Sequence, residues 1–327
     1  MHAIRLHAFG PAENLLYEVV DDPTPGPGQV RIRVSVAGVH LVDTAIRAGR
    51  SPATFPEPEL PTIPGREVAG TVDAVGTRVG HEWVGRRVVA HLGLAGGGYA
   101  ELAVGDVAAV HVIPETVTDH AAVAMIGTGR TALAVLDAAR LQVDDVVLVT
   151  AAAGGLGSLF VQAAAGVGAT VVGVAGGTAK VDAVRTLGAN VAVDYRQPHW
   201  PDAVRAQLDG REITAALDGV GGDIGRQALE LLGPGGRLLL LGFASGAHTP
   251  LSAVDLFAKG LAVHAAPALG LLRRPGALRA FEERAIAAAA SGALRPVVGR
   301  PFPLANAALA HRAMEGRQTM GKTVLEV

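Results

Sequence analysis

The sequence has no cysteine, few aromatic residues and almost no excess charge. The absence of thiols excludes disulfides, thiolate nucleophiles, cysteine-ligated iron–sulfur clusters and thiolate zinc sites. A formal net charge of -2, with 18% charged residues, gives no field that would attract nucleic acid or an anionic membrane. Any redox chemistry in this chain therefore needs a bound organic cofactor.

Signals for export and membrane insertion are also missing. Residues 1–20 lack the basic stretch and apolar run of a secretory signal, so we expect a cytoplasmic protein. Residues 146–179 contain no Asp, Glu, Lys or Arg and exceed the roughly 20 residues that cross a bilayer. Glycines interrupt this stretch and β-branched residues flank it, which predicts a buried strand, helix and strand instead.

The residue pattern changes along the chain, and a length of 327 residues suits two domains. Residues 1–115 are rich in short strand-like runs and Pro/Gly turns, which predicts an antiparallel β domain. From Ala121 onward apolar strands alternate with helical repeats, which is typical of a parallel sheet covered by helices. After Gly260 the pattern is mixed, and we expect this last part to return to the first domain.

A glycine-rich turn follows the apolar run at residues 146–150 and precedes an amphipathic helix. Compared with the G-x-G-x-x-G fingerprint, Ala152 replaces the first glycine, whereas Gly154, Gly155 and Gly157 are in place. A strand, tight turn and helix N-terminus in this order predict a pyrophosphate site built from backbone N–H groups. The expected contacts are Ala153, Gly154, Gly155, Leu156 and Gly157.

The choice between NAD and NADP depends on the end of the next strand. An NAD enzyme would place an acidic residue there to hold the ribose hydroxyls, but this chain has Ala175, Gly176 and Gly177. Lys180 follows and would neutralise a 2′-phosphate, so the sequence predicts NADPH. The alternative for Lys180 is an ordinary solvated lysine on a helix surface.

Four motifs together resemble the zinc-free quinone oxidoreductase branch of the medium-chain dehydrogenases and reductases, over essentially the whole chain. They are PGREVAGTVDAVG at 64–76, AAAGGLG at 151–157, LGANVAVDY at 187–195 and GRQTMGKTVLEV at 316–327. The resemblance implies an α/β fold with a Rossmann NADPH-binding domain at 121–262. It also implies a discontinuous, GroES-like β-rich catalytic domain at 1–120 and 263–327, an active site between the domains and a homodimer. An edge strand near residues 261–266 is the expected dimer contact.

The same resemblance implies further cofactor contacts. Lys180, Tyr195 and Arg317 match the family's 2′-phosphate residues, with Gly176 as the small residue between them. Thr131 matches a threonine near the nicotinamide, and the turn at 242–246 matches a loop that approaches the same ring. That loop contributes Gly242, Phe243, Ala244 and Ser245. For Thr131 and this loop, ordinary helix and turn chemistry is the alternative.

Zinc-dependent members of the superfamily have a Gly-His-Glu motif where this chain has Gly65, Arg66 and Glu67. They also have a structural-zinc lobe with four cysteines, all absent here. His40 takes the place of their first cysteine ligand, but a catalytic zinc needs three protein ligands, and a guanidinium beside it would repel the metal. We therefore expect no metal, and we expect Arg66 to pair with Glu67 across the vacated position.

His40 and Asp43 are the candidate catalytic residues. His40 is expected to donate a hydrogen bond or proton to the reduced carbonyl, with Asp43 orienting it. Most relatives have asparagine at the His40 position, so the alternative is a structural His40 and an Asp43 that caps the following helix. The tyrosines that relatives carry after this segment are missing, which predicts a differently shaped pocket supplied in part by Phe55.

These observations predict hydride transfer from NADPH to a quinone or enone, since a conjugated acceptor spreads the incoming charge without a metal. Two alternatives remain open at this stage. One is an enoyl-thioester reductase, which uses the same cofactor and hydride step. The other is a protein that binds NADPH without turnover as a sensor or structural component.

Overall fold

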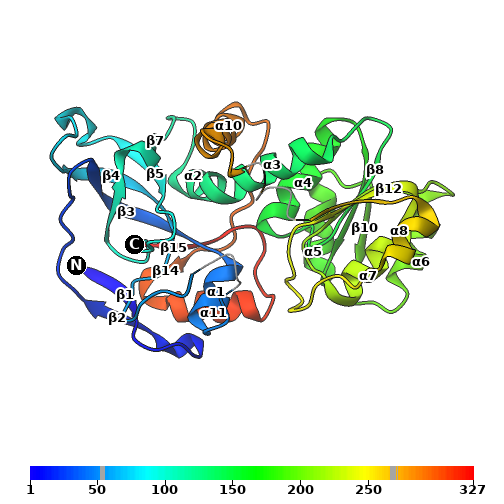
Figure 1. The fold of residues 1–327 in the computed structure, drawn as a ribbon, viewed down its shortest axis with the longest axis horizontal. Helices are drawn as coiled ribbons and strands as arrows, with labels where there is room; N and C mark the ends of the chain where they lie inside the picture. Colours follow the sequence, from blue (N-terminus) through cyan, green and yellow to red (C-terminus); the bar gives the residue numbers. More distant parts are fainter. Residues whose placement is uncertain (52–55, 266–269, 271) are drawn as a thin grey trace. The chain divides into compact units, whose positions relative to one another are not determined.

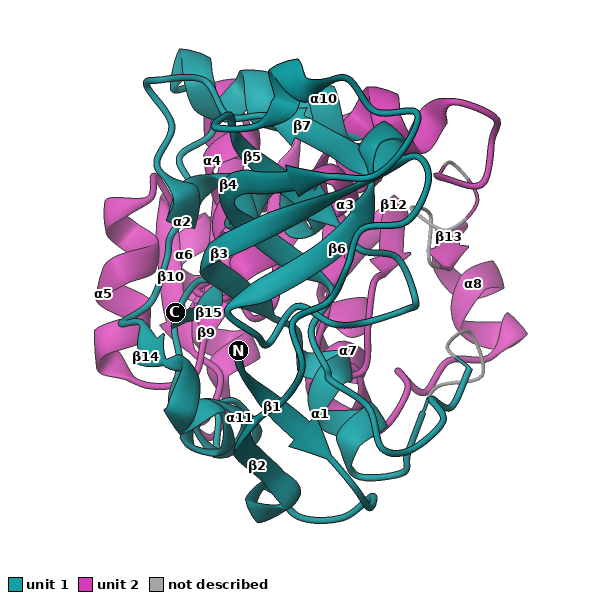
Figure 2. Ribbon diagram, turned by 90° about the vertical axis from the view of Figure 1, so that its left-hand side faces the viewer, with its two compact units in different colours: residues 1–129, 282–327 teal, residues 130–281 magenta. Residues whose placement is uncertain are grey.

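The computed structural model describes residues 1–51, 56–265, 270 and 272–327. The chain forms two compact units, one of residues 1–129 and 282–327 and one of residues 130–281, coloured separately in Figure 2. The end of the chain thus returns to the first unit. The second unit begins and ends later than the predicted 121–262. One reason is that strand β13 (Ala262–Ala265) pairs with β12 (Leu232–Leu240) and so extends the parallel sheet beyond residue 262.

The first unit is built on a mainly antiparallel sheet of seven described strands, in the order β14-β15-β3-β4-β5-β7 with β6 also paired to β3, in which only β14 and β15 run parallel to each other. A separate pair, β1-β2, completes its β structure. Its strands are β1 His2–Leu6, β2 Leu15–Val19, β3 Gln29–Val39, β4 Glu67–Val75, β5 Arg87–His91, β6 Leu102–Asp106, β7 Val110–Val112, β14 Phe302–Pro303 and β15 Thr323–Glu326. The closing strand β15 pairs with β3, and this pairing brings the C-terminal segment beside residues 36–39.

Helical segments of the first unit are short, apart from α10. They are α1 Leu41–Arg47, α2 Asp119–Ala124, a π-helical turn at Met125–Gly129, α10 Ala277–Ser291 and α11 Ala307–Glu315. Helix α10 begins in the second unit. The 3-10 turns are at Ala12–Asn14, His81–Trp83, Val107–Ala109 and Leu304–Asn306. The inward residues of β3 alternate, as in Val30, Ile32 and Val34, and join the main apolar core. A second cluster joins Val123 and Ile126 to Ile286 of α10.

The second unit is a six-stranded parallel sheet in the order β10-β9-β8-β11-β12-β13. Its strands β8, β10 and β12 are labelled in Figure 1. Its elements are α3 Arg130–Ala139, β8 Val146–Val149, α4 Gly155–Gly166, β9 Thr170–Ala175, α5 Thr178–Thr186, β10 Val191–Asp194, α6 Trp200–Leu208, β11 Ile213–Asp218, α7 Gly222–Leu231, β12, α8 Ala253–Lys259 and β13. The chain progresses outward from β8 to β10, then restarts beside β8 with β11. Since crossovers are right-handed, this reversal puts α4 and α5 on one face and α6 and α7 on the other.

The central strands β8, β9 and β11 are buried on both faces, as their continuous apolar runs predict, whereas the edge strand β13 is largely exposed. All four residues of β8 are buried, and α6 covers the sheet through Trp200, Val204 and Leu208. The stretch 146–179 therefore forms a strand, a helix, a strand and the start of α5, as expected from its glycines. Only Asp119–Ala139, among the described helices, is long and apolar enough for a membrane span. Because 61% of its most apolar window is buried within the fold, it matches a core helix equally well.

Candidate functional site

The turn after β8 has the geometry that a phosphate group needs. Gly154 is the N-cap of α4, and Ala151 has a φ of 48°. A Cβ on Gly157 would lie 2.3 Å from the Ala151 carbonyl oxygen, so only glycine lets the helix approach the turn this closely. The N–H groups of the first turn of α4 remain available for an anion, because a helix cannot satisfy them itself.

The carboxyl end of β9 brings together most of the predicted 2′-phosphate residues. A Cβ on Gly176 would lie 3.3 Å from the Tyr195 hydroxyl, so Gly176 and Tyr195 are neighbours. Lys180 lies in the first turn of α5, which begins directly after the glycine pair Gly176 and Gly177. Arg317 belongs to the other compact unit, with a φ of 54°, and its part in the same site stays a prediction.

Arg196 is a residue that the sequence reasoning missed. It follows Tyr195 directly, and a Cβ on Gly177 would lie 2.5 Å from its Nη2 atom. Its Nε and Nη2 atoms donate to the two carboxylate oxygens of Asp194 at 3.2 and 3.1 Å. Burial opposes the charge on Asp194, but the hydrogen bonds from Arg196 prevail and lower the pKa of this carboxyl to about 2. Arg196 is thus a cation fixed beside the glycine pair, and its adjacency to Tyr195 was the available signal.

Strands β8 and β11 are the pair at which the sheet reverses direction, and ligands bind at such switch points in open α/β sheets. Thr150, after β8, donates to the buried Asp218 at the end of β11 with a distance of 2.8 Å. Thr249 donates to the other Asp218 oxygen at 2.6 Å. Asp218 was not singled out from the sequence, although the following Gly-Val-Gly-Gly run marks a turn.

The predicted loop 242–246 is anchored at this switch point. The backbone N–H of Ala244 donates to the Gly219 carbonyl at 3.2 Å, and that of Ser245 donates to the Val220 carbonyl at 2.8 Å. Phe243 is 42% exposed, and its ring packs against the His248 ring with a centroid distance of 4.7 Å. The loop's backbone position therefore suits the contact expected of Gly242, Phe243, Ala244 and Ser245. Thr131, which was predicted beside them, lies on α3 of the same unit.

The candidate catalytic residues lie in the first unit, where β3 ends and α1 begins. His40 has an extended backbone as the N-cap of α1, and Asp43, three residues later, accepts a hydrogen bond from its backbone N–H at 2.8 Å. The other Asp43 oxygen accepts from Arg66 at 3.0 Å. Asp43 thus fixes the start of the helix and thereby the position of the His40 backbone.

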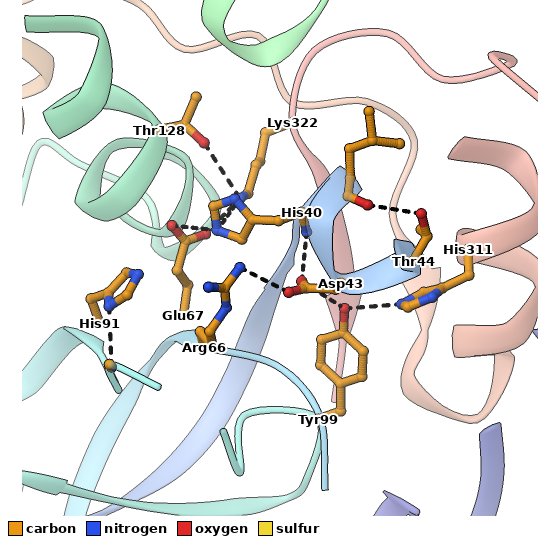
Figure 3. A network of polar contacts seen from close by, with 12 residues as sticks. His40, Asp43, Thr44, Arg66, Glu67, His91, Tyr99, Thr128, His311 and Lys322 are labelled. Carbon is orange, nitrogen blue, oxygen red and sulfur yellow. Dashed lines mark hydrogen bonds and ion pairs between the residues drawn. The ribbon is translucent and has the colours of Figure 1, made fainter. Parts of the chain in front are cut away.

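The His40 ring contacts a different pair of residues (Figure 3). Its Nε2 atom lies 2.8 Å from Glu67 Oε1 and 3.1 Å from Lys322 Nζ. Lys322 Nζ also lies 2.5 Å from Glu67 Oε2 and 3.4 Å from the Thr128 hydroxyl. Arg66 and Glu67 were expected to pair with each other, whereas the ion pairs described here join Arg66 to Asp43 and Glu67 to His40 and Lys322. Lys322 was not predicted, because it is 282 residues from His40.

Two glycines make room for the Glu67 carboxylate. A Cβ on Gly38 would lie 2.4 Å from Glu67 Oε2, and a Cβ on Gly127 in the π-helical turn would lie 1.8 Å from Oε1. The carboxylate is fully buried. Burial opposes its charge, but His40 and Lys322 hold the pKa of Glu67 well below its ordinary value. The carboxylate is therefore a fixed negative charge under the imidazole.

Behind Asp43 lies a second buried network. Tyr99 donates a hydrogen bond to Asp43 at 3.3 Å, and its hydroxyl also lies 3.2 Å from His311 Nε2 (Figure 3). Burial and the Asp43 carboxylate raise the pKa of Tyr99 well above its ordinary value. Burial also lowers the pKa of His311 to about 4, against the attraction of Asp43. Both groups are neutral near pH 7 and serve as hydrogen-bonding supports.

These residues do not fit a catalytic zinc ion. His40 and Glu67 would offer two donor groups, but the Lys322 ammonium already neutralises the carboxylate, and Arg66 stands where zinc relatives have histidine. Across the part of the chain that the structure describes, no group of three or more His, Cys, Asp or Glu side chains is arranged for a metal. The predicted pocket residue Phe55 lies outside the described residues.

Comparisons with known proteins cover nearly the whole chain. The family model described as alcohol dehydrogenase GroES-like domain matches residues 26–115, and the one described as zinc-binding dehydrogenase matches residues 155–283. A 2-haloacrylate reductase from Burkholderia sp. is 33% identical over 98% of this chain and 97% of its own length. A quinone oxidoreductase from Pseudomonas aeruginosa is 33% identical, with 98% of each chain covered.

Solved structures agree with these sequence matches. A mycobacterial protein in complex with NADPH has a TM-score of 0.88 and 32% identity, with 100% of both chains covered. The Escherichia coli quinone oxidoreductase, also in complex with NADPH, has a TM-score of 0.87 and 27% identity over 100% of both chains. These findings confirm both the resemblance and the α/β fold class expected from the sequence. The chain belongs to the zinc-free quinone oxidoreductase branch of the medium-chain dehydrogenases and reductases.

Proposed function

We propose that this protein transfers hydride from NADPH to a conjugated carbonyl compound, a quinone or an enone. The observation that carries the proposal is the His40, Glu67 and Lys322 cluster, which takes the place of a metal site in this family. Without a Lewis acid, the acceptor itself has to spread the incoming charge, as quinones and enones do. Of the two relatives described above, one is named a quinone oxidoreductase and the other is named for a 2-haloacrylate, an α,β-unsaturated carboxylate.

The second unit has the features that NADPH needs. The backbone of residues 153–157 would hold the pyrophosphate at the start of α4, and Lys180, Tyr195 and Arg196 would hold the 2′-phosphate. Arg317 is proposed for the same phosphate on the family resemblance alone. No acidic residue stands in the turn directly after β9, and the neighbouring Asp194 carboxylate is paired with Arg196. Bound NADPH would supply a hydride from C4 of its nicotinamide ring.

In the first unit, His40 would donate to the carbonyl oxygen as it gains negative charge. Asp43 would act on the backbone, by fixing the N-cap at which His40 stands. This gives Asp43 a positioning role, which differs from orientation of the imidazole itself. Thr131 and the 242–246 loop would approach the nicotinamide end of the cofactor.

The proposal extends to assembly and location. Strand β13 ends the order of the parallel sheet, and its exposed edge would pair with its copy in a homodimer. We place this dimer in the cytoplasm, without nucleic-acid or membrane partners. Light scattering of the purified protein would show twice the 33.2 kDa chain mass, and a monomer would contradict the assembly.

The decisive experiment is oxidation of NADPH and NADH by metal-free protein with a panel of acceptors. The panel contains a quinone, an enone, 2-chloroacrylate, an enoyl thioester and a saturated aldehyde. Turnover with NADPH and conjugated carbonyls, without turnover of the aldehyde, supports the proposal. Turnover confined to the thioester favours an enoyl-thioester reductase, and tight NADPH binding without any turnover favours a sensor or structural role.

A further inference from the structure

A single nitrogen of His40 has two partners of opposite character. Lys322 Nζ and Glu67 Oε1 both lie within 3.1 Å of Nε2 (Figure 3). An ammonium group can only donate a hydrogen bond, and a carboxylate can only accept one. Nε2 therefore has a partner in both of its protonation states. It accepts a hydrogen bond from Lys322 when it is deprotonated, and it faces Glu67 when it carries a proton.

The same three side chains differ in their access to solvent. The His40 side chain is 22% exposed, whereas the side chains of Lys322 and Glu67 are 4% and 0% exposed. A substrate that enters from solvent can therefore reach the imidazole, but not the ammonium behind it. The imidazole, at 3.1 Å from Lys322 Nζ, therefore offers a proton a path from the buried ammonium to such a substrate.

The ammonium is held firmly in this position. It forms hydrogen bonds with His40 Nε2 and with the Thr128 hydroxyl of the π-helical turn, and an ion pair with Glu67. On the far side of Glu67, His91 at the end of β5 contributes to the stabilisation of the carboxylate. The nearby Arg66 guanidinium is paired with Asp43. The charges around His40 thus come from β4, β5 and the segment just before β15.

We propose that Lys322 is a positioning residue that supplies, through His40, the proton taken up by the reduced acceptor. This inference rests on the proposed function, because the acceptor becomes an oxygen anion when it receives a hydride. The oxygen then forms a bond to the Nδ1 proton of His40 as the Nδ1–H bond breaks. Nε2 in turn takes a proton from Lys322 Nζ, and no electrons are exchanged in either transfer.

After these transfers the imidazole is neutral in its other tautomer, with Nε2–H donating to Glu67. Lys322 is a neutral amine, and it regains its proton from solvent between turnovers. Glu67 keeps its charge throughout. The cluster thereby neutralises the product oxygen without a metal and without leaving a charged imidazole in the site.

Lys322→Arg tests this step, since arginine keeps the charge and the donors but does not release its proton. We expect this variant to fold and to bind NADPH as the wild type does, with kcat about 100-fold lower. Its solvent deuterium isotope effect on kcat should rise, because proton transfer then limits the rate. Lys259→Arg on α8 is the matched control, and it should change neither quantity. Unchanged kcat and an unchanged isotope effect in Lys322→Arg overturn the relay.

A second readout does not depend on turnover. Nitrogen-15 NMR of the histidine rings, with the His40 signals assigned from His40→Gln, reports which ring nitrogen carries the proton. We expect the Nδ1–H tautomer in the wild type and the Nε2–H tautomer in Lys322→Met, where Glu67 is the remaining partner. The same tautomer in both proteins would contradict the role of Lys322. A wild type that reduces no acceptor would overturn the proposed function as well, whereas normal turnover by Lys322→Arg would overturn the relay alone.

Discussion

In the unit of residues 130–281, the groups that would meet the cofactor are mostly backbone atoms and glycines, and they follow one another closely along the chain. In the other unit, the functional groups are charged side chains from distant segments, such as His40, Glu67 and Lys322. A backbone site depends on local turn geometry, whereas a side-chain site depends on the packing of the whole sheet. Substitutions should therefore affect the two units differently.

The largest expected effect comes from Asp43, which joins α1, Arg66 and Tyr99. Asp43→Ala removes the partner of a buried guanidinium, and we expect the free energy of unfolding to fall by about 4 kcal/mol in chemical denaturation. Asp73→Ala is the control, because its partner Arg31 is partly exposed; it should cost about 1 kcal/mol or less. Equal losses in both variants would mean that burial of the network contributes little.

Gly127→Ala should break the His40 cluster without removing any of its members. The new Cβ would lie 1.8 Å from Oε1 of the fully buried Glu67 carboxylate, so the carboxylate would have to leave its place beside His40 and Lys322. We expect a loss of about 3 kcal/mol in stability together with a loss of acceptor turnover. Gly166→Ala, where the Cβ meets no atom within 4 Å, should leave both measurements within error of the wild type. Full activity in Gly127→Ala would show that the carboxylate position is not needed.

The support network of the first unit should also give the protein a specific pH dependence. His311 has a pKa of about 4 in the folded state and an ordinary value of 6.5. The unfolded chain therefore binds the extra proton first, so stability is complete above pH 6.5 and falls by up to about 3 kcal/mol as the pH drops toward 4. Glu67, with its lowered pKa, adds a loss only below about 4.5.

This pH dependence is measured by denaturation between pH 4 and 7 in the wild type and in His311→Gln, which keeps a hydrogen-bonding group near Tyr99. The variant should have a flatter profile across this range. A slope as steep as that of the wild type would assign the effect to other groups.

The smallest change should come from Arg196 in the second unit, and it should affect mainly recognition. Arg196→Ala is expected to weaken NADPH binding by about 2 kcal/mol, roughly 30-fold, and to leave NADH binding unchanged, with a modest loss of stability because Asp194 loses its partner. Titration calorimetry with both cofactors would measure this, with Arg185→Ala on the exposed face of α5 as the control. Equal weakening of both cofactors would place Arg196 away from the 2′-phosphate.

The features that the sequence predicted are local backbone patterns, and those that it did not predict are contacts between distant side chains. The 154–157 turn and the missing acid after β9 were legible because each is a local pattern with a known backbone requirement. Lys322 and the partners of Arg66 were not, because they depend on the pairing of β15 with β3 and on the entry into α1. Asp43 was predicted to orient His40, with a helix cap as the alternative, and its contacts with Arg66 and Tyr99 exist only in the folded chain.

The Glu67 carboxylate, held between two glycines and an ammonium, also bears on how such a site can evolve. Arg66→His would restore the histidine of the zinc enzymes, yet Lys322 would still place a positive charge 2.5 Å from Glu67. Lys322 alone could change, but Arg66 would then still repel a metal. Neither substitution alone would create a metal site, so gaining metal chemistry requires both at once, which is an epistatic barrier. Descendants of this chain would therefore keep its dependence on acceptors that need no metal activation.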